Sequence, residues 1–303
     1  MKSVLAVLFF LGSVWSVSAQ ETGDLLGELD EIAPDKPQPV SATFKSTRII
    51  NGHSVETIAA KHMDFRISHR FGTINSGFNN LWGLDESRVR LGFEFGVTDD
   101  LTIGVGRSGY LKEYDYFAKY KLLKQTNGDF RKPVTVTLLA SASTNTMDTS
   151  PSMQFFNNLE RQSYVGAILV ARKFGDRLSL EVNPTVVHRN KTATPLDVNT
   201  LYALGMGGRV KLNKRTTFNA EYNYVANNLL GSEFARDPIY KNNLSLGFDI
   251  ETGGHVFQLH ISNSRGMIEK QFIGDTTDEW LNGGIFYGFN ISRIFSFEKD
   301  RKK

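Results

Sequence analysis

The sequence contains no cysteine, and this absence excludes several kinds of site at once. Disulfide bonds, thiolate-bound metals and cysteine nucleophiles all need the missing thiol. An anchor attached through a lipidated cysteine is excluded for the same reason. Any chemistry in this chain therefore depends on oxygen and nitrogen side chains.

Long apolar runs are also missing after the first 20 residues. No uncharged apolar stretch there approaches the roughly 18–20 residues that a membrane-spanning helix needs. The longest such stretches, 134–142 and 165–171, have the length of a strand. Charged residues make up 22% of the chain and the mean hydropathy is −0.27. These values exclude both a helical membrane protein and a disordered polyelectrolyte.

Neither sign of charge dominates the sequence. Thirty-five Lys and Arg residues oppose 32 Asp and Glu residues, which gives a net charge of +3. This excess is small and evenly spread, whereas nucleic-acid-binding proteins carry concentrated basic patches. We therefore expect no nucleic-acid partner.

The first nineteen residues are expected to be an export signal. Lys2 supplies a positive charge, residues 4–14 form an apolar stretch too short to span a bilayer, and Val17-Ser18-Ala19 offers a small-residue cleavage site. Residues 20–56 then form a periplasmic extension that begins acidic and proline-bearing. Within it, residues 43–56 mix apolar and charged side chains, so they should fold as an inward plug, an extra strand piece or a periplasmic cap.

From residue 57 to residue 297 the sequence alternates with period two. In 88–97, for example, Leu91, Phe93 and Phe95 alternate with small or charged residues. Successive side chains of a strand point to opposite faces, so one face is apolar and the other polar. The pattern predicts twelve strands, near 58–70, 88–97, 101–106, 114–122, 134–142, 161–173, 178–183, 202–211, 218–224, 244–250, 257–262 and 284–297.

The connections between these strands alternate strictly between two kinds. Short turns lie at 98–100, 127–128, 175–176, 213–214 and 252–254, and longer polar loops lie at 71–86, 107–113, 144–160, 188–199, 226–240 and 263–282. An outer-membrane barrel has an even strand number, short periplasmic turns and long external loops. We therefore predict an all-β fold, a single closed antiparallel transmembrane β-barrel over 57–297, followed by a charged tail at 298–303. A soluble all-β secreted protein is the rival structure.

Several ordered motifs carry a family resemblance. They are the stretch 43–57, His69-Arg70-Phe71-Gly72, Trp82-Gly83-Leu84-Asp85 and the stretch 257–264. Together they resemble a Bacteroidetes barrel family catalogued as domain of unknown function 5777, over nearly the whole chain after the export signal. The resemblance implies an outer-membrane β-barrel and no established activity, so it assigns no catalytic residue.

The polar face of the predicted strands should line the lumen, while the apolar face meets lipid. Twelve strands make a bore wider than the ~8-strand kind that side chains fill, yet narrower than the 16–18-stranded porins. Lumen charges of both signs then either pair across the bore and stiffen the barrel or line the route of a small solute. The candidates are Asp64, Arg66, Arg88, Arg90, Glu94, Asp115, Lys119, Lys121, Glu181, Arg209, Lys211, Glu221 and Asp249.

The first long loop is bracketed by residues that are expected to anchor it. His69 and Arg70 precede the loop, and Asp85 follows it at a place where it would pair with Arg70 or Arg88. The six histidines do not show the close spacing with carboxylates that metal ligands usually have. We expect no metal and no cofactor.

An enzymatic alternative depends on His260 and Ser262. Residues two apart share a strand face, and a serine nucleophile needs an adjacent base. The motif resembles the outer-membrane lipid A deacylases, in which a His, a Ser and a downstream Glu act together. Those barrels, however, have fewer strands and a lipid-facing site, and the nearest downstream glutamates here, Glu269 and Glu279, lie in the following loop.

The leading functional hypothesis is therefore non-enzymatic. It is a small-solute channel or transporter, or a binding scaffold, in the bacterial outer membrane after signal-peptide export. The expected partners are outer-membrane lipid and lipopolysaccharide, the outer-membrane assembly machinery that recognises aromatic C-terminal strands, and a small solute. A lipid or ester hydrolase using His260 and Ser262 is the alternative.

Overall fold

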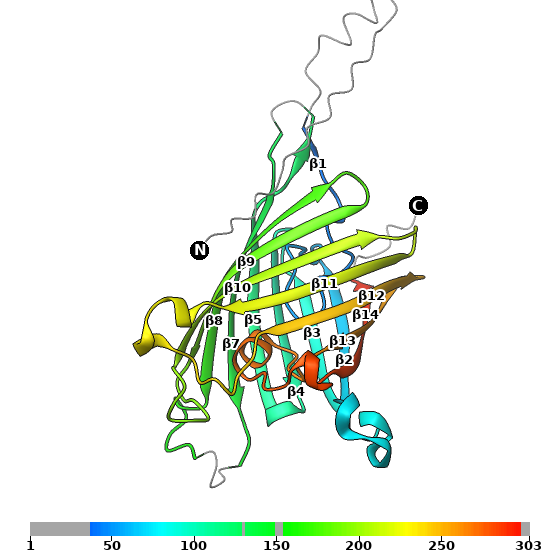
Figure 1. Ribbon diagram of the computed structural model, residues 1–303. Coiled ribbons are helices and arrows are strands. Elements are labelled where there is room, and N and C mark those ends of the chain that lie inside the picture. Colours follow the sequence, from blue (N-terminus) through cyan, green and yellow to red (C-terminus); the bar gives the residue numbers. More distant parts are fainter. Residues whose placement is uncertain (1–36, 129–130, 149–153, 298–303) are drawn as a thin grey trace, which may run out of the picture. The chain divides into compact units, whose positions relative to one another are not determined.

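A computed structural model describes residues 37–128, 131–148 and 154–297. Within them, twelve antiparallel strands form one closed barrel (Figure 1), so the predicted fold class is confirmed. The barrel strands are β2 (His62–Thr73), β3 (Arg88–Gly96), β4 (Leu101–Ser108), β5 (Glu113–Leu123), β7 (Thr135–Asn145), β8 (Gln162–Phe174), β9 (Leu178–Arg189), β10 (Thr200–Lys211), β11 (Thr216–Val225), β12 (Asn243–Thr252), β13 (His255–Ser262) and β14 (Phe286–Ser296).

The barrel closes where the last strand pairs with the first. Asn290 of β14 lies opposite Ser68 of β2, and the register shifts once, between Phe286 and Gly288. Each strand therefore has a hydrogen-bonded neighbour on both sides. Closure removes the sheet edges that hydrocarbon would not tolerate.

The two faces of the wall follow the alternation in the sequence. On β3, Leu91, Phe93 and Phe95 point outward and remain 38–45% exposed, whereas Arg90 and Glu94 point inward and are buried. Because a strand sends alternate residues to opposite faces, every strand repeats this division. The barrel is thus apolar outside and polar inside, the reverse of a soluble protein.

The connections gather by length at the two ends of the barrel (Figure 1). The short-turn end holds 97–100, 175–177, 212–215 and 253–254. The opposite, long-loop end holds the short helices of the described residues: η1 (Ile74–Ser76), η2 (Phe78–Gly83), η3 (Tyr110–Lys112), η4 (Asn227–Leu229), η5 (Ser232–Phe234), α2 (Glu269–Gly274) and η6 (Trp280–Asn282). Among the described residues, no helix is both long and apolar enough to cross a membrane.

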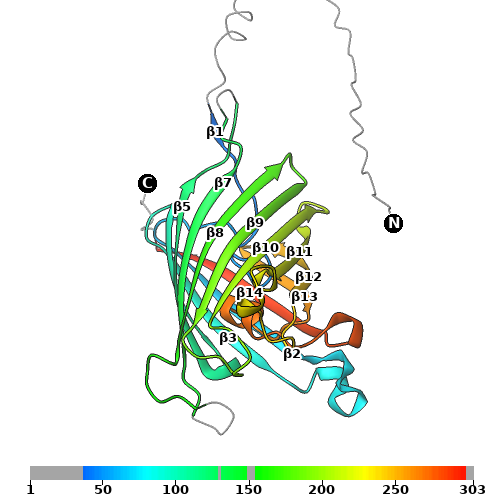
Figure 2. The same cartoon turned by 60° about the vertical axis from the view of Figure 1, so that its left-hand side comes forward.

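One predicted short turn is longer than expected. The turn at 127–128 belongs to a connection from 124 to 134, in which β6 (Thr126–Asn127) pairs with β1 (Gln38–Pro39). The two strands project beyond the barrel at the short-turn end (Figure 2). Local sequence did not predict this pairing because β1 lies almost 90 residues upstream. The predicted export signal and the charged tail lie outside the described residues.

The orientation of the barrel is testable on intact cells. We expect the long-loop end to face outside and the short-turn end to face the periplasm. Antibody should therefore reach an epitope inserted at Asp148, which is exposed in a long loop, without permeabilisation. An epitope at Asn213, in a short turn, should be reached only after the outer membrane is permeabilised. The opposite labelling pattern would reverse the orientation.

The outward face should reject charge in the middle of a strand. Leu259, at the centre of β13, is 55% exposed, and Leu281, in the loop helix η6, is 99% exposed. Leu259→Arg places a guanidinium against hydrocarbon and should destabilise the barrel by about 2–4 kcal/mol. Leu281→Arg is the matched control and should leave stability nearly unchanged. Refolding into lipid vesicles measures both, and equal effects would contradict a lipid-facing Leu259.

Candidate functional site

Residues 43–58, which we call the plug segment, lie inside the barrel. All twelve wall strands contribute to its contacts, through Arg66, Glu94, Thr102, Lys119, Thr137, Leu169, Glu181, Arg209, Glu221, Ser245, Gln258 and Asn290. Of the three positions that the sequence left open for this stretch, the structure therefore has the inward plug.

Both ends of the plug segment lie at the short-turn end. The Thr57 hydroxyl donates to the carbonyl of Asp99 in the β3–β4 turn at 2.8 Å. At the other end, Lys173 near the end of β8 donates to the carbonyl of Ser41 at 2.9 Å. The segment thus enters the lumen, reverses and leaves on the same side.

The tip of the plug is held by one buried carboxylate. The backbone N–H groups of Ile50, Asn51 and Gly52 all donate to Oε2 of Glu221, at 3.1, 3.0 and 3.0 Å. Three converging N–H groups form a concave anion site. The side chain of Asn51 reaches further, accepting from Arg70 at 2.6 Å and donating to Ser245 at 2.8 Å.

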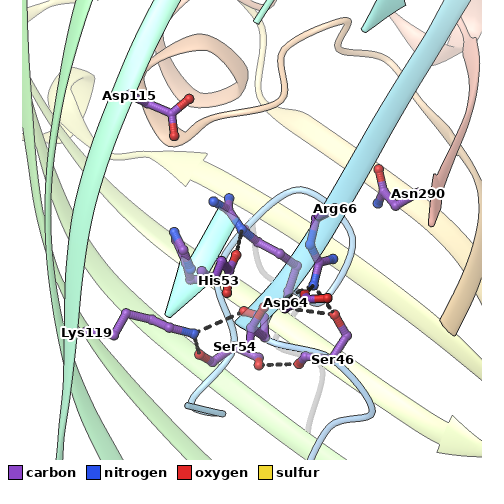
Figure 3. A network of polar contacts seen from close by, with 12 residues as sticks. Ser46, His53, Ser54, Asp64, Arg66, Asp115, Lys119 and Asn290 are labelled. Atoms are coloured by element: carbon purple, nitrogen blue, oxygen red, sulfur yellow. Dashed lines mark hydrogen bonds and ion pairs between the residues drawn. The ribbon is translucent and has the colours of Figure 1, made fainter. Parts of the chain in front are cut away.

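Wall cations bind the carbonyl groups on the two flanks of the plug. Nζ of Lys119 donates to the carbonyls of Thr47, Ser54 and Glu56 at 3.2, 3.2 and 2.5 Å. Figure 3 shows this side chain extending from the wall toward Ser54. On β10, Nη1 of Arg209 donates to the carbonyl of Thr43 in the plug and to that of Ala42 just before it, both at 2.9 Å.

Other wall charges are paired on the wall itself. Arg66 donates to Asp64 on the same strand at 2.9 Å and also to the hydroxyl of Ser46 in the plug at 2.7 Å (Figure 3). Arg90 on β3 binds Asp115 on β5 through two hydrogen bonds, at 2.9 and 2.5 Å. In both pairs the opposite charge comes from the wall itself.

The plug also has an apolar side. Phe44, Ile49, Ile50 and Val55 form a buried cluster with inward-facing wall residues, namely Phe117, Leu139, Ala167, Leu169 and Ala171. Full burial of such side chains stabilises by about 1.5–3 kcal/mol each. Ile49 packs directly over Gly207 of β10, where an added Cβ would lie 2.2 Å from its Cδ1 and would force that side chain to move.

A second segment fills the lumen from the long-loop end. This inserted loop, residues 263–282, carries α2, and Phe272 and Ile273 of that helix join a buried cluster with wall residues Val165, Val187, Leu201, Ala203 and Val225. Lys270 pairs with Asp275 at 2.9 Å and with Glu113 on β5 at 3.2 Å. Gln271 donates to the same glutamate at 2.6 Å.

The plug segment and the inserted loop meet inside the bore. Glu269 of α2 lies 3.5 Å from Arg48 and accepts the backbone N–H of His53 at 3.4 Å. Burial, and then the neighbouring charge of Arg48, lower the pKa of His53 well below its usual value, so its ring is neutral at neutral pH. Arg48 also lies 3.9 Å from Glu94 of the wall. The lumen is therefore filled from both ends.

The predicted lumen charges differ in how deeply they are buried in the bore. Ten of the thirteen are buried in the interior: Asp64, Arg66, Arg90, Glu94, Asp115, Lys119, Glu181, Arg209, Glu221 and Asp249. Lys121 and Lys211 are half-buried near strand ends, and Lys121 lies 3.7 Å from Glu56. Arg88 begins β3 at the long-loop rim and is exposed. The prediction that it lines the lumen is therefore wrong.

The predicted loop anchors do not come together. Arg70 points inward, where it binds Asn51 and donates to Asn290 at 3.1 Å. His69 points outward and stacks on Phe289 with ring centroids 4.9 Å apart. Asp85 is exposed, and among the described residues no ion pair joins it to Arg70 or Arg88. Alternation explains the difference, because His69 and Arg70 are consecutive strand residues.

His260 and Ser262 share the inner face but are not hydrogen-bonded to each other in the described structure. The Ser262 hydroxyl accepts from Asn243 and Ser245, both at 2.9 Å, and from the backbone of Ser264 at 3.0 Å. His260 instead lies over Gly288, where an added Cβ would be 2.3 Å from its Nε2. A serine nucleophile needs its base within hydrogen-bond reach, so the described geometry contains no assembled dyad.

Sequence reasoning missed the uncharged residues that hold the plug. Gln258 donates to the carbonyl of Ile49 at 2.5 Å, and Asn290 donates to that of Ile50 at 3.0 Å. Period-two alternation places both on the inner face, so this signal was available. No group of three or more His, Asp or Glu side chains suited to a metal ion is found in the described ranges.

A family model described as a membrane bound beta barrel domain, DUF5777, matches residues 44–295. The chain belongs to the DUF5777 family. Its match begins at Phe44, so the plug segment is part of the DUF5777 domain and not an appended linker. As a member, this barrel is a membrane protein, and its apolar outer face is the face that meets lipid.

Solved structures similar to this DUF5777 barrel are distant. The KdgM porin is 12% identical, with a TM-score of 0.45, over 78% of this chain and 99% of that one. An outer membrane channel from Pseudomonas putida F1 is 9% identical, with a TM-score of 0.46, over 80% and 98%. No curated protein matches the sequence. These similarities assign no function.

The role of Glu221 in binding the plug tip, residues 50–52, is testable by hydrogen exchange. Glu221→Ala leaves three buried N–H groups without an acceptor, and each unpaired group costs about 1–3 kcal/mol. Exchange of the amides of Ile50, Asn51 and Gly52 should therefore accelerate at least about tenfold. The control is Glu251→Ala, whose carboxylate pairs with Lys45 at the rim and is 44% exposed, so little change is expected. Equal exchange in both variants would contradict the assigned role.

Proposed function

We propose that this barrel is a small-solute channel of the outer membrane and that the plugged lumen is its closed state. The observation that carries the proposal is the path of the plug segment. Because it enters and leaves at the short-turn end, it can withdraw without being threaded through the bore. A plug with one end on each side of the barrel could not do so.

The bonds that hold the plug support the same function. Most of them join charged or amide side chains of the wall to plug main chain, and water can replace each partner when the plug leaves. Exposure of the apolar cluster opposes withdrawal, so opening requires a favourable interaction elsewhere. With short turns in the periplasm, that interaction acts from the periplasmic side.

An emptied lumen would discriminate weakly between anions and cations. Seven buried carboxylates face the bore, at Asp64, Glu94, Glu113, Asp115, Glu181, Glu221 and Asp249, against six cations at Arg66, Arg70, Arg90, Lys119, Arg189 and Arg209. Near-balance gives no strong field of either sign. The charges keep the wall hydrated and leave selection to hydrogen bonding.

We propose no enzymatic activity, since the Ser262 hydroxyl accepts from Asn243 and Ser245 and no hydrogen bond joins it to His260 in the described structure. The expected external partners remain membrane lipid, lipopolysaccharide and the assembly machinery. A binding scaffold with a permanent plug is the second candidate, and the buried apolar cluster favours it. The channel and the scaffold differ in whether a weakened plug opens the bore.

Conductance in planar bilayers distinguishes channel from scaffold. Asn51→Ala with Gly52→Pro removes the two Asn51 bonds and one N–H bond to Glu221 but leaves every wall residue intact. These losses correspond to several times 1 kcal/mol, so the open probability should rise at least about tenfold. The matched control is Asn157→Ala with Asn158→Pro in an exposed loop, which should conduct like the parent. A plug variant whose conductance is no higher than that of its control would favour the scaffold.

A further inference from the structure

The lumen wall holds the plug segment mainly through the plug's main chain. Fourteen hydrogen bonds join side chains of the wall or the inserted loop to backbone groups of residues 42–58. In six the side chain accepts from N–H, and in eight it donates to C=O. Main-chain groups are the same in every peptide. The wall is therefore arranged to bind peptide backbone with little dependence on sequence.

The two kinds of backbone group meet wall groups of opposite sign. The N–H groups of the tip and of Val55 go to the buried carboxylates of Glu221 and Glu181. The carbonyls go to Lys119, Arg209 and the amides of Gln258 and Asn290. The bonds of the two carboxylates, Lys119 and Arg209 are charge-assisted, and such bonds are shorter and about twice as strong as neutral ones. A ligand that offers both N–H donors and carbonyl acceptors satisfies both sets together.

The same wall provides room for apolar side chains. Phe117, Leu139 and Leu169 receive those of the plug, and Gly207 leaves the space that Ile49 occupies. Once the plug has withdrawn, these features remain on the wall. They describe a site for a chain of amides with small or apolar side chains.

We propose that the plug segment is an intramolecular stand-in for the solute and that the solute is a short peptide. This inference rests on the proposed function as a channel. Glu221 and Glu181 take the ammonium and amide N–H groups of the peptide, and Lys119 and Arg209 take its carbonyls and terminal carboxylate. A neutral sugar offers hydroxyl groups alone, which leaves the wall charges less well paired.

The test uses the variant Asn51→Ala with Gly52→Pro, in which the plug is weakened and the wall is intact. In planar bilayers, tri-alanine added on the short-turn side should block the current transiently. Maltotriose, an uncharged solute of comparable length, should need at least about tenfold higher concentration for the same block. Equal block by the two solutes would overturn the inference.

Wall variants made in the same background locate the peptide site. Lys119→Gln removes a charge that binds three carbonyls, and Gln258→Ala removes one amide donor at lower risk to assembly. Either should weaken block by tri-alanine, the first by about tenfold or more. Glu160→Gln breaks a loop ion pair with Lys191 outside the plug contacts and should leave the block unchanged. Block that is insensitive to both wall variants would overturn the assignment of the site.

Failure of the channel and failure of the peptide site give different results. A variant that conducts but does not prefer tri-alanine leaves the channel standing and rejects the peptide. If no variant conducts, the channel is rejected, and calorimetric titration of tri-alanine into the detergent-solubilised plug variant decides the inference. Saturable binding that Lys119→Gln abolishes would support the peptide site, and absence of binding would reject it.

Discussion

Hydrogen bonding of buried main chain is the constraint on which the interior of this barrel depends. A peptide segment inside the bore is shielded from water, and each unpaired N–H or C=O there costs free energy. The plug segment forms no sheet ladder with the wall, so side chains must supply the partners. Glu221 accepts from three backbone N–H groups, and Lys119 donates to three backbone carbonyls. Wall charges of both signs are therefore required by the two polarities of the peptide group.

This constraint also explains why the lumen charges do not simply pair with one another. Arg90 and Asp115 pair across strands. Glu181 and Arg209, by contrast, are buried against plug backbone. Emptying the bore would leave such groups to water, which hydrates them well. The wall groups are thus bonded by the plug when the lumen is filled and by water when it is empty. This is why the plug can be removable.

The two segments in the bore constrain each other through Glu269. Its carboxylate lies at the junction of Arg48 from the plug and α2 from the inserted loop. Movement of either segment would leave a buried charge without its partner, which is strongly unfavourable. The plug and the inserted loop therefore depend on each other although they enter from opposite ends.

Proximity in sequence was a poor guide to chemistry on the inner face. His260 and Ser262 share a strand face as alternation requires, yet the serine binds Asn243 and Ser245 on the adjacent strand. Arg70, expected to anchor a loop, binds the tip of the plug instead. Both outcomes depend on which residues lie opposite in the folded barrel, and sequence spacing along one strand does not contain that information.

The sequence by itself determined the barrel. Alternation with period two predicted the strands, the face of each residue and the two ends, because side-chain direction in a strand is a local property. It could also place Gln258 and Asn290 on the inner face. Only the tertiary structure decided what fills the bore. Whether residues 43–56 lie in the lumen, across its mouth or along a strand depends on pairing with Glu221, more than 160 residues away, and on the room left by Gly207. Contacts so distant in sequence leave no local pattern, because each partner alone is an ordinary polar or small residue of a strand.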